Sequence, residues 1–114
     1  MSTNGKLATA GRPTKKRRSS LRFEVLNAFV DEGLKRLKPA EAVVWTVLYR
    51  DTKPDGTART AVEDLARRAG FSRHTVLRAL KQLERKRMLQ VVRRGGLNRG
   101  PSSYRVFPFP DDWG

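Results

Sequence analysis

Apolar positions are spaced most regularly in the segment 60–83. Val62, Leu65 and Ala69 repeat at intervals of three and four residues, which is the period of an amphipathic helix. Gly70 follows them and supplies the left-handed residue at which helices commonly end. This spacing predicts a first short helix, and we expect the rest of the chain to support the unit that it opens.

Both helices of a two-helix unit are marked by capping residues. Thr60 and Glu63 match the capping-box pattern, in which each side chain bonds the backbone amide of the other residue. Ser72 is suited to cap a second helix, which we expect over 72–86. The apolar side of that second helix consists of Val76, Ala79, Leu80 and Leu83.

A lead-in helix is predicted over 21–37, ahead of this unit. Gly33 interrupts its pattern, and glycine costs up to about 1 kcal/mol relative to alanine in a helix interior. We expect its apolar stripe to pack on the domain, and a surface for a protein partner is the alternative interpretation. The stripe consists of Phe23, Leu26, Val30, Leu34 and Leu37.

The next helix is predicted over 39–51. Pro39 is tolerated in a first helical turn, and the Glu41 carboxylate is favourable near the positive end of the helix dipole. Apolar residues surround this helix almost completely, so we expect it to form the back of the core. Trp45 and Tyr49 are interpreted as core residues, and a surface that stacks on bases is the alternative.

The last part of the chain predicts β-structure. Its β-branched and aromatic runs favour two strands joined by a glycine-rich loop, which together form a hairpin with a basic tip. A tail over 108–114 follows, and its Trp113 either docks on the domain or contacts a partner. The expected strands are 88–94 and 102–107, the loop is 95–101, and a further short extended piece lies at 57–60.

The net charge adds a partner to this picture. The chain of 114 residues carries 25 Lys and Arg against 11 Asp and Glu, a formal net charge of +14. A surplus of this size favours a polyanionic partner, and nucleic acid is the first candidate. The length suits one small domain with tails.

Several classes of function are excluded by residues that the sequence lacks. There is no cysteine and only 1 histidine, so we expect neither disulfides nor a metal site. No apolar run of about eighteen residues, secretory signal or lipid anchor is present, so we expect no membrane association. We find no paired carboxylates, nucleophile with a base or phosphate-cradling loop, and therefore expect neither an enzyme nor a cofactor. These expectations favour a cytoplasmic, nucleoid-associated protein.

Residues 1–20 are expected to form a disordered basic arm, since they contain no acidic residue and few large apolar ones. Gly11-Arg12-Pro13 resembles the centre of an AT-hook, although Ala10 stands where that peptide has its first arginine. The alternative interpretation is nonspecific contact with phosphates. The cations of the arm are Arg12, Lys15, Lys16, Arg17 and Arg18.

The order of helix, short strand, two-helix unit and hairpin resembles a winged helix-turn-helix domain over 38–107. The matching residues are Leu65-Ala66, Gly70-Phe71-Ser72-Arg73, Thr75-Val76, Ala79-Leu80, Leu83-Glu84 and Met88-Leu89. The lead-in resembles those of bacterial transcription regulators and of plasmid or phage replication proteins. The resemblance implies a mainly α fold with a small β-hairpin (α+β), in which a lead-in helix precedes a three-helix core plus wing. Arg87 departs from the family, because many relatives have a glycine there.

In this family the second helix of the unit lies in the major groove of DNA, with its N-terminal residues nearest the bases. The wing meets the backbone or the minor groove, and the supporting helix holds flanking phosphates. Without the resemblance, the same charges would be interpreted as a solvated helix face. The resemblance implies base contacts from Ser72, Arg73, His74, Thr75, Leu77, Arg78 and Lys81. It implies phosphate contacts from Arg59, Arg67 and Arg68, and wing contacts from Arg93, Arg94, Asn98, Arg99 and Arg105.

Three functions are consistent with this interpretation. Sequence-specific binding of double-stranded DNA by a transcription regulator is favoured. A replication-initiator or accessory module is the alternative, and a protein- or RNA-binding winged helix is a further one. A homodimer, or a complex with another protein, would form through 21–37 or 108–114. Leu77 stands where relatives are often polar, which favours either contact with a thymine methyl group or a partner surface.

Overall fold

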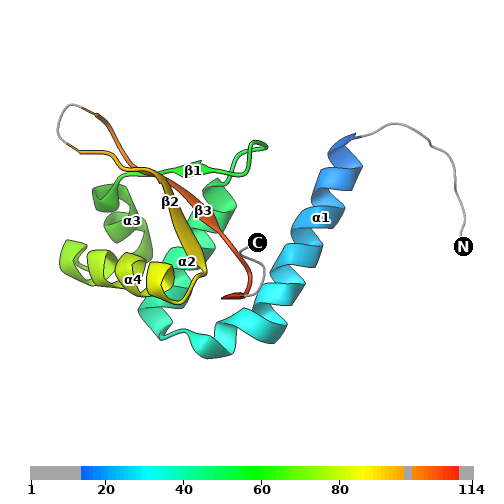
Figure 1. The fold of residues 1–114 in the computed structure, drawn as a ribbon, viewed down its shortest axis with the longest axis horizontal. Helices are drawn as coiled ribbons and strands as arrows, with labels where there is room; N and C mark the ends of the chain where they lie inside the picture. Colours follow the sequence, from blue (N-terminus) through cyan, green and yellow to red (C-terminus); the bar gives the residue numbers. More distant parts are fainter. Residues whose placement is uncertain (1–13, 97–98, 111–114) are drawn as a thin grey trace, which may run out of the picture.

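The structure is a computed structural model, and it describes residues 14–96 and 99–110, with side chains from residue 21 onward. Figure 1 shows α1 at one side of the molecule, α3 and α4 at the other, and α2 between them. The elements in chain order are α1 (Thr14–Ala28), the π-helical turn η2 (Phe29–Gly33), the 3-10 turn η3 (Leu34–Arg36), α2 (Pro39–Asp51), β1 (Ala58–Arg59), α3 (Val62–Ala69), α4 (Arg73–Arg85), β2 (Leu89–Arg93) and β3 (Ser103–Val106).

The strands form one antiparallel sheet in the order β1-β3-β2. Tyr104 of β3 pairs with Val91 of β2 on one side and with Ala58 of β1 on the other. The register shifts between Val91 and Arg93, where β2 leads into the wing. The sheet therefore has one strand more than the predicted hairpin, because the extended piece expected at 57–60 joins its edge.

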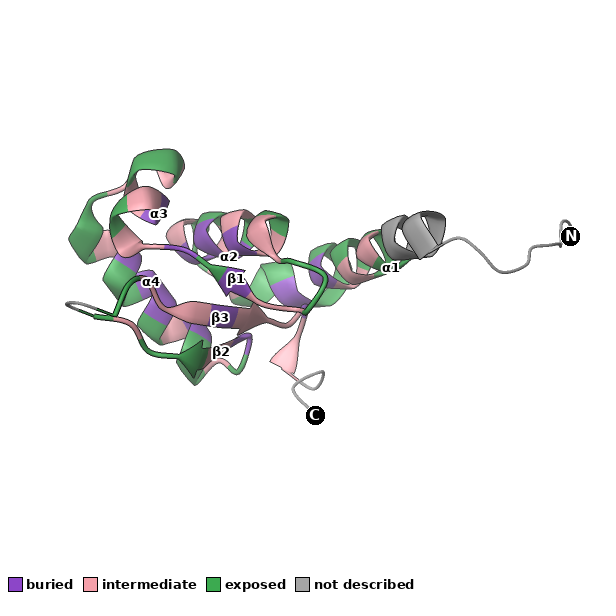
Figure 2. Ribbon diagram, turned by 90° about the horizontal axis from the view of Figure 1, so that it is seen from above, coloured by how far each residue is buried: buried purple, intermediate pink, exposed green. Residues whose placement is uncertain are grey.

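A single apolar core lies between the helices and the sheet. Trp45, Leu65 and Leu83, from α2, α3 and α4, are fully buried, and Leu89 contributes from the sheet. Figure 2 shows buried residues on α2, α4 and β3, whereas much of α1 is exposed. The fold is mainly α with a small antiparallel sheet, and it has the winged helix-turn-helix architecture that the sequence predicts.

Helix α2 has the predicted bounds. The backbone amide of Lys38 donates to Glu41 Oε1 at 3.1 Å, so this carboxylate caps the helix start. Trp45 stacks on Phe29 with ring centroids 3.7 Å apart, and its Nε1 donates to the carbonyl of Phe107 at 3.0 Å. The interpretation of Trp45 as a core residue is confirmed, because a fully buried ring has no face left for a base.

The lead-in helix differs from the prediction in extent and in orientation. α1 begins at Thr14, inside the segment expected to be a disordered arm. The predicted stripe does not pack on the domain as expected, because Phe23 is 68% exposed and Val30 is 53% exposed. Phe29, at 3% exposure, faces the core instead. Among the stripe residues, Leu37 packs against the core, whereas Phe23, Leu26, Val30 and Leu34 are exposed.

Gly33 explains which side of the lead-in helix meets the domain. A Cβ atom at Gly33 would lie 2.0 Å from the Pro108 carbonyl oxygen and 2.7 Å from Met88 Cε, so only glycine permits this approach. Arg22 docks the same helix, since its Nη2 donates to the Tyr49 carbonyl at 3.1 Å and its own carbonyl accepts from the Tyr49 hydroxyl at 2.9 Å. The sequence pattern indicated that Gly33 weakens the helix, whereas the structure shows that it permits docking.

The capping box predicted from Thr60 and Glu63 is wrong. The N-cap of α3 is Ala61, which makes no side-chain cap hydrogen bond. Thr60 Oγ1 donates instead to Asp51 Oδ2 at 3.0 Å. Because Thr60 is only 5% exposed, its hydroxyl needs a partner inside the protein, and the carboxylate at the end of α2 provides one. The predicted helix end at Gly70 is confirmed, with φ 78° at this residue.

Candidate nucleic-acid interface

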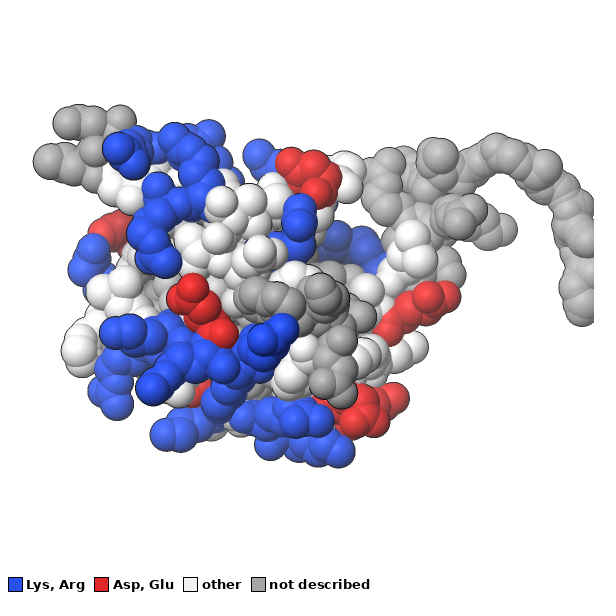
Figure 3. Space-filling model, viewed as in Figure 1, with Lys and Arg blue, Asp and Glu red and all other residues white. Residues whose placement is uncertain are grey.

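A groove of about 1160 Å³ lies between α4 and the wing, the hairpin formed by β2, β3 and their connection. Val91, Arg94 and Tyr104 line it from the sheet side. Figure 3 shows Lys and Arg side chains gathered over the wing and over α4, with mostly uncharged surface and a few acidic side chains between the two groups. Helix α4 is the one expected from the sequence to lie in the major groove, and we call it the recognition helix. The helix side of the groove includes five of its residues for which base contacts are predicted, Arg73, His74, Leu77, Arg78 and Lys81.

The start of α4 is fixed by Ser72, as predicted. Its Oγ accepts a hydrogen bond from the Thr75 amide at 3.1 Å and lies 3.0 Å from Thr75 Oγ1. Both hydroxyls therefore take part in the cap, and a base would have to compete with it. The base contacts implied for Ser72 and Thr75 stay predictions.

Arg73 opens α4 and reaches back to α3. Its Nε donates to Glu63 Oε2 at 2.9 Å, and the two side chains are 61% and 70% exposed. The hydrogen bond from Arg73 is the main reason that the pKa of Glu63 is lowered, with a backbone hydrogen bond adding to it. The carboxylate is therefore ionised at neutral pH, and Arg73 lines the groove while paired with Glu63.

The other cations of α4 present their charges differently. Arg78 and Lys81 are exposed, and neither forms an ion pair with any residue that the structure describes. Leu77 is 39% exposed beside them in the groove. The helix face thus combines charges suited to phosphates or base acceptors with one apolar side chain suited to a methyl group.

Two arginines of the wing and one of β1 lie close to the wing backbone. Arg93 Nη1 donates to the Arg99 carbonyl at 3.3 Å, across the hairpin. A Cβ atom at Gly95 would lie 2.1 Å from the Gly100 carbonyl oxygen, so the two sides of the wing approach closely here. Arg59 of β1 joins them, with its Nη2 2.8 Å from the position that a Cβ atom would take at Gly100.

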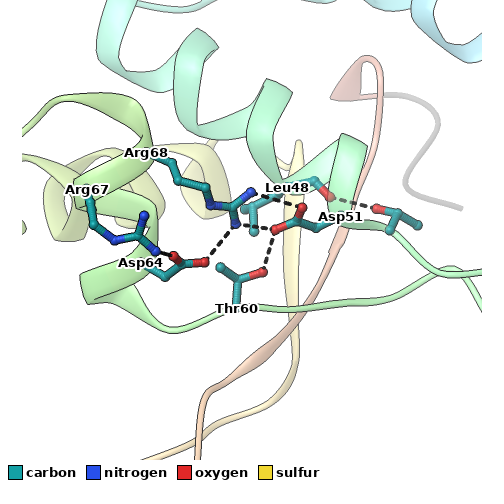
Figure 4. A network of polar contacts seen from close by, with 7 residues as sticks. Leu48, Asp51, Thr60, Asp64, Arg67 and Arg68 are labelled. Atoms are coloured by element: carbon teal, nitrogen blue, oxygen red, sulfur yellow. Dashed lines mark hydrogen bonds and ion pairs between the residues drawn. The ribbon is translucent and has the colours of Figure 1, made fainter.

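Arg68 lies in the ion-pair network that Figure 4 shows, and it does not line the groove. Its guanidinium is 3.2 Å from Asp51 Oδ1 through Nη1 and 3.0 Å from Asp64 Oδ2 through Nη2. The hydrogen bond from Arg68 is the main cause that lowers the pKa of Asp51, and Thr60 contributes in the same direction. The phosphate contact implied for Arg68 stays a prediction, and it would require the guanidinium to leave two carboxylates.

Arg67 and Arg105 also lie outside the groove lining. Arg67 pairs with Asp64 on the same helix. Arg105 Nε donates to the Gly56 carbonyl at 3.4 Å and so covers the turn before β1 rather than the wing tip. The structure therefore separates both residues from the groove residues with which the sequence grouped them.

Some predicted contacts fall outside the described part of the chain. Arg12, Asn98 and Trp113 are not described, and Lys15, Lys16, Arg17 and Arg18 are described only as helical backbone of α1. Their roles stay predictions. In the described ranges, no helix combines the length and apolar character needed to cross a membrane, and no cluster of His, Asp and Glu could hold a metal ion.

Two acidic residues of the groove were missed by sequence reasoning. Glu63 and Glu84 both line it among the cations. Glu63 stands three residues after Thr60, so the sequence pattern predicts a cap for it and gives no sign of its contact with Arg73. The signal that could have found it is its place in the first turn of α3, since a tight turn between two helices brings that region toward the start of the next helix.

Comparisons with known proteins are sparse. No protein-family model matches the chain, and no curated protein sequence matches it. Among solved structures, the chain is similar to the PcaV transcriptional regulator from Streptomyces coelicolor, crystallised with its natural ligand. The two are 18% identical, the match covers 88% of this chain and 67% of PcaV, and the TM-score is 0.47. The function proposed below therefore rests on the groove and its side chains.

Proposed function

We propose that this protein binds double-stranded DNA with sequence preference, with α4 in the major groove and the wing on the adjacent backbone. The observation that carries the proposal is the composition of the groove, where Arg78, Lys81 and the apolar Leu77 face Arg94 across the same hollow. The major groove admits an α-helix, and its base edges offer acceptors to arginine and methyl groups to apolar side chains.

Phosphate contacts supply the rest of the affinity. Arg93 and Arg99 of the wing and Arg59 of β1 gather where the DNA backbone would pass beside a helix seated in the major groove. Such contacts position the protein without reading sequence. Affinity should fall with salt at a log-log slope of about −0.9 for each phosphate neutralised on a duplex.

Selection of bound sites from random duplex DNA tests this proposal. We expect a motif from the wild-type chain, and the variant Arg78→Ala should lose preference at one position, a cost of about 1 to 3 kcal/mol. Arg36→Ala is the matched control, because Arg36 is an exposed arginine of η3 that does not line the groove. The absence of any motif, or equal effects of the two variants, would contradict the proposal.

The biological process that DNA binding would serve is a second and more specific proposal. A transcription regulator is favoured, since a small basic domain that reads a short site needs no further activity to act at a promoter. Sites that recur in tandem at an origin would favour the replication module instead. Equal affinity for duplexes, single strands and RNA would favour the RNA-binding alternative and count against sequence reading by α4.

The partner surface expected over 21–37 is also kept as a proposal, on the outer face of α1. A second copy of the chain is the occupant we propose, because in the sequence cations at 15–18 precede this segment and the acids Asp31 and Glu32 lie toward its end, a charge order that is complementary in an antiparallel pair. Light scattering should give a dimer that Phe23→Glu disrupts. Leu21→Glu is the control on the same helix outside the stripe, and a monomeric wild type would overturn the proposal.

A further inference from the structure

The groove holds an arrangement that DNA attraction alone does not explain. A site that only gathered phosphates would gain from unpaired cations, yet Arg73, the first residue of the recognition helix, is bound by Glu63. The pair brings no net charge to the end of the helix that lies nearest the bases. What the pair fixes is the geometry of the Arg73 guanidinium.

We propose that Glu63 is a positioning residue that holds Arg73 ready to read guanine, an inference that rests on the proposed DNA binding. A guanidinium has five N–H donors in a rigid fork, and guanine offers two acceptors, O6 and N7, in the major groove. Glu63 Oε2 binds Nε of Arg73 at 2.9 Å, so the two Nη groups remain to form the paired contact.

The position of Glu63 supports this role. It lies in the first turn of α3, a rigid element that packs on the core through Leu65, so the carboxylate is held by the fold rather than by a loop. A free arginine side chain loses rotamer freedom on binding, and a tether made beforehand reduces that loss. A carboxylate beside Arg73 also repels phosphates, which lowers the sequence-independent part of the affinity, so that the guanine contact makes up a larger share of it.

Glu84 provides a matched control from the same groove. It is an exposed carboxylate that lines the groove, and it forms no ion pair with Arg73, whose partner is Glu63. Glu63→Gln and Glu84→Gln each remove one negative charge, so both should raise affinity for nonspecific duplexes. Only Glu63→Gln should change how well Arg73 discriminates among bases.

The experiment measures binding of the full chain to its selected duplex, to duplexes substituted at each guanine, and to a scrambled duplex. We expect Arg73→Ala to remove about 5- to 100-fold discrimination at one guanine, in line with a bidentate base contact. Glu63→Gln should lower discrimination at the same guanine by about two- to fivefold, as suits an exposed ion pair, and should have no further effect in the Arg73→Ala background. Glu84→Gln should leave the discrimination ratio unchanged.

Three outcomes would overturn the inference. Equal changes in the discrimination ratio for Glu63→Gln and Glu84→Gln would show that only charge matters. An unchanged ratio for Glu63→Gln, with Arg73→Ala still losing its guanine, would leave the proposed function intact and refute the positioning role. A wild-type chain that selects no motif would refute the proposed function itself, and the positioning role with it.

Discussion

Glu41 and Lys86 form an ion pair that joins the start of α2 to the end of α4. Glu41 Oε1 lies 2.6 Å from Lys86 Nζ, and their side chains are 5% and 29% exposed. Lys86 Nζ also donates to the Arg36 carbonyl at 2.9 Å, so one ammonium ties the lead-in segment to both helices. This contact is independent of the groove and bears on stability.

Lys86→Met should lower the free energy of unfolding by about 3 kcal/mol, because the buried carboxylate of Glu41 keeps its hydrogen bond from the Lys38 amide but loses its cation. Urea denaturation measures this loss. Lys35→Met is the matched control, since the Lys35–Glu32 pair is 3.9 Å apart with side chains 67% and 57% exposed. The control should change stability by less than about 1 kcal/mol. Equal losses in the two variants would contradict the structural role of Lys86.

The carboxylate of Asp51 should make stability depend on pH. Its folded pKa is lowered below the ordinary value of 3.8, first by the hydrogen bond from Arg68. A lowered folded pKa means that the stabilisation is complete above the ordinary pKa and is lost as pH falls through the folded one. Denaturation between pH 7 and pH 2 should therefore show a smaller acid loss in Asp51→Asn than in the wild type. Glu24→Gln, an exposed change on α1, should retain the wild-type profile, and parallel profiles for Asp51→Asn and wild type would refute this prediction.

Gly33→Ala should destabilise the docking of the lead-in helix. The added Cβ would meet the Pro108 carbonyl oxygen and Met88 Cε, so either the helix or the C-terminal segment must move. Overpacking of this kind costs about 1 to 3 kcal/mol. Thermal unfolding checks the direction, with Asn27→Ala, an exposed change on α1, as the control. A rise in stability from Gly33→Ala, as helix propensity alone would give, would contradict the structural account.

Arg87→Gly should stabilise the protein. Arg87 has φ 62°, a left-handed conformation that costs side-chain-bearing residues about 1 to 2 kcal/mol and costs glycine little. The comparison is Arg85→Gly, which places glycine in the last turn of α4 and should lower stability by up to about 1 kcal/mol. A loss of stability in both variants would show that the contacts of the Arg87 side chain outweigh its backbone strain.

The sequence predicted the features that short-range chemistry determines. Ser72 and Gly70 are local signals, and the structure confirms the cap and the helix end at these residues. The side of the lead-in segment that packs was predicted wrongly, because it depends on the close approach of Gly33 to Pro108, which lies far along the chain. Thr60 shows the same limit, since its cap pattern is outweighed by a buried partner on another helix.

The residues that line the groove could be predicted only in part, because helical spacing is a local feature whereas ion-pair partners depend on long-range contacts. Arg78 and Lys81 could be placed on the outer face of α4 from helical spacing, and both line the groove, while their contacts with DNA stay predictions. Arg68 has the same residue type and also lies on a helix, but Asp51 and Asp64 occupy its guanidinium. Sequence shows which residues carry charge, whereas the partners that each charge finds are decided by tertiary structure.

The stacking of Trp45 on Phe29 gives the protein an internal optical reporter. The indole lies between the lead-in segment and the core, and its N–H is fixed to the Phe107 carbonyl near the C-terminal end. Its fluorescence therefore senses both ends of the chain at once. With the second of the 2 tryptophans removed by Trp113→Phe, a shift of the emission maximum would report separation of the lead-in segment from the core.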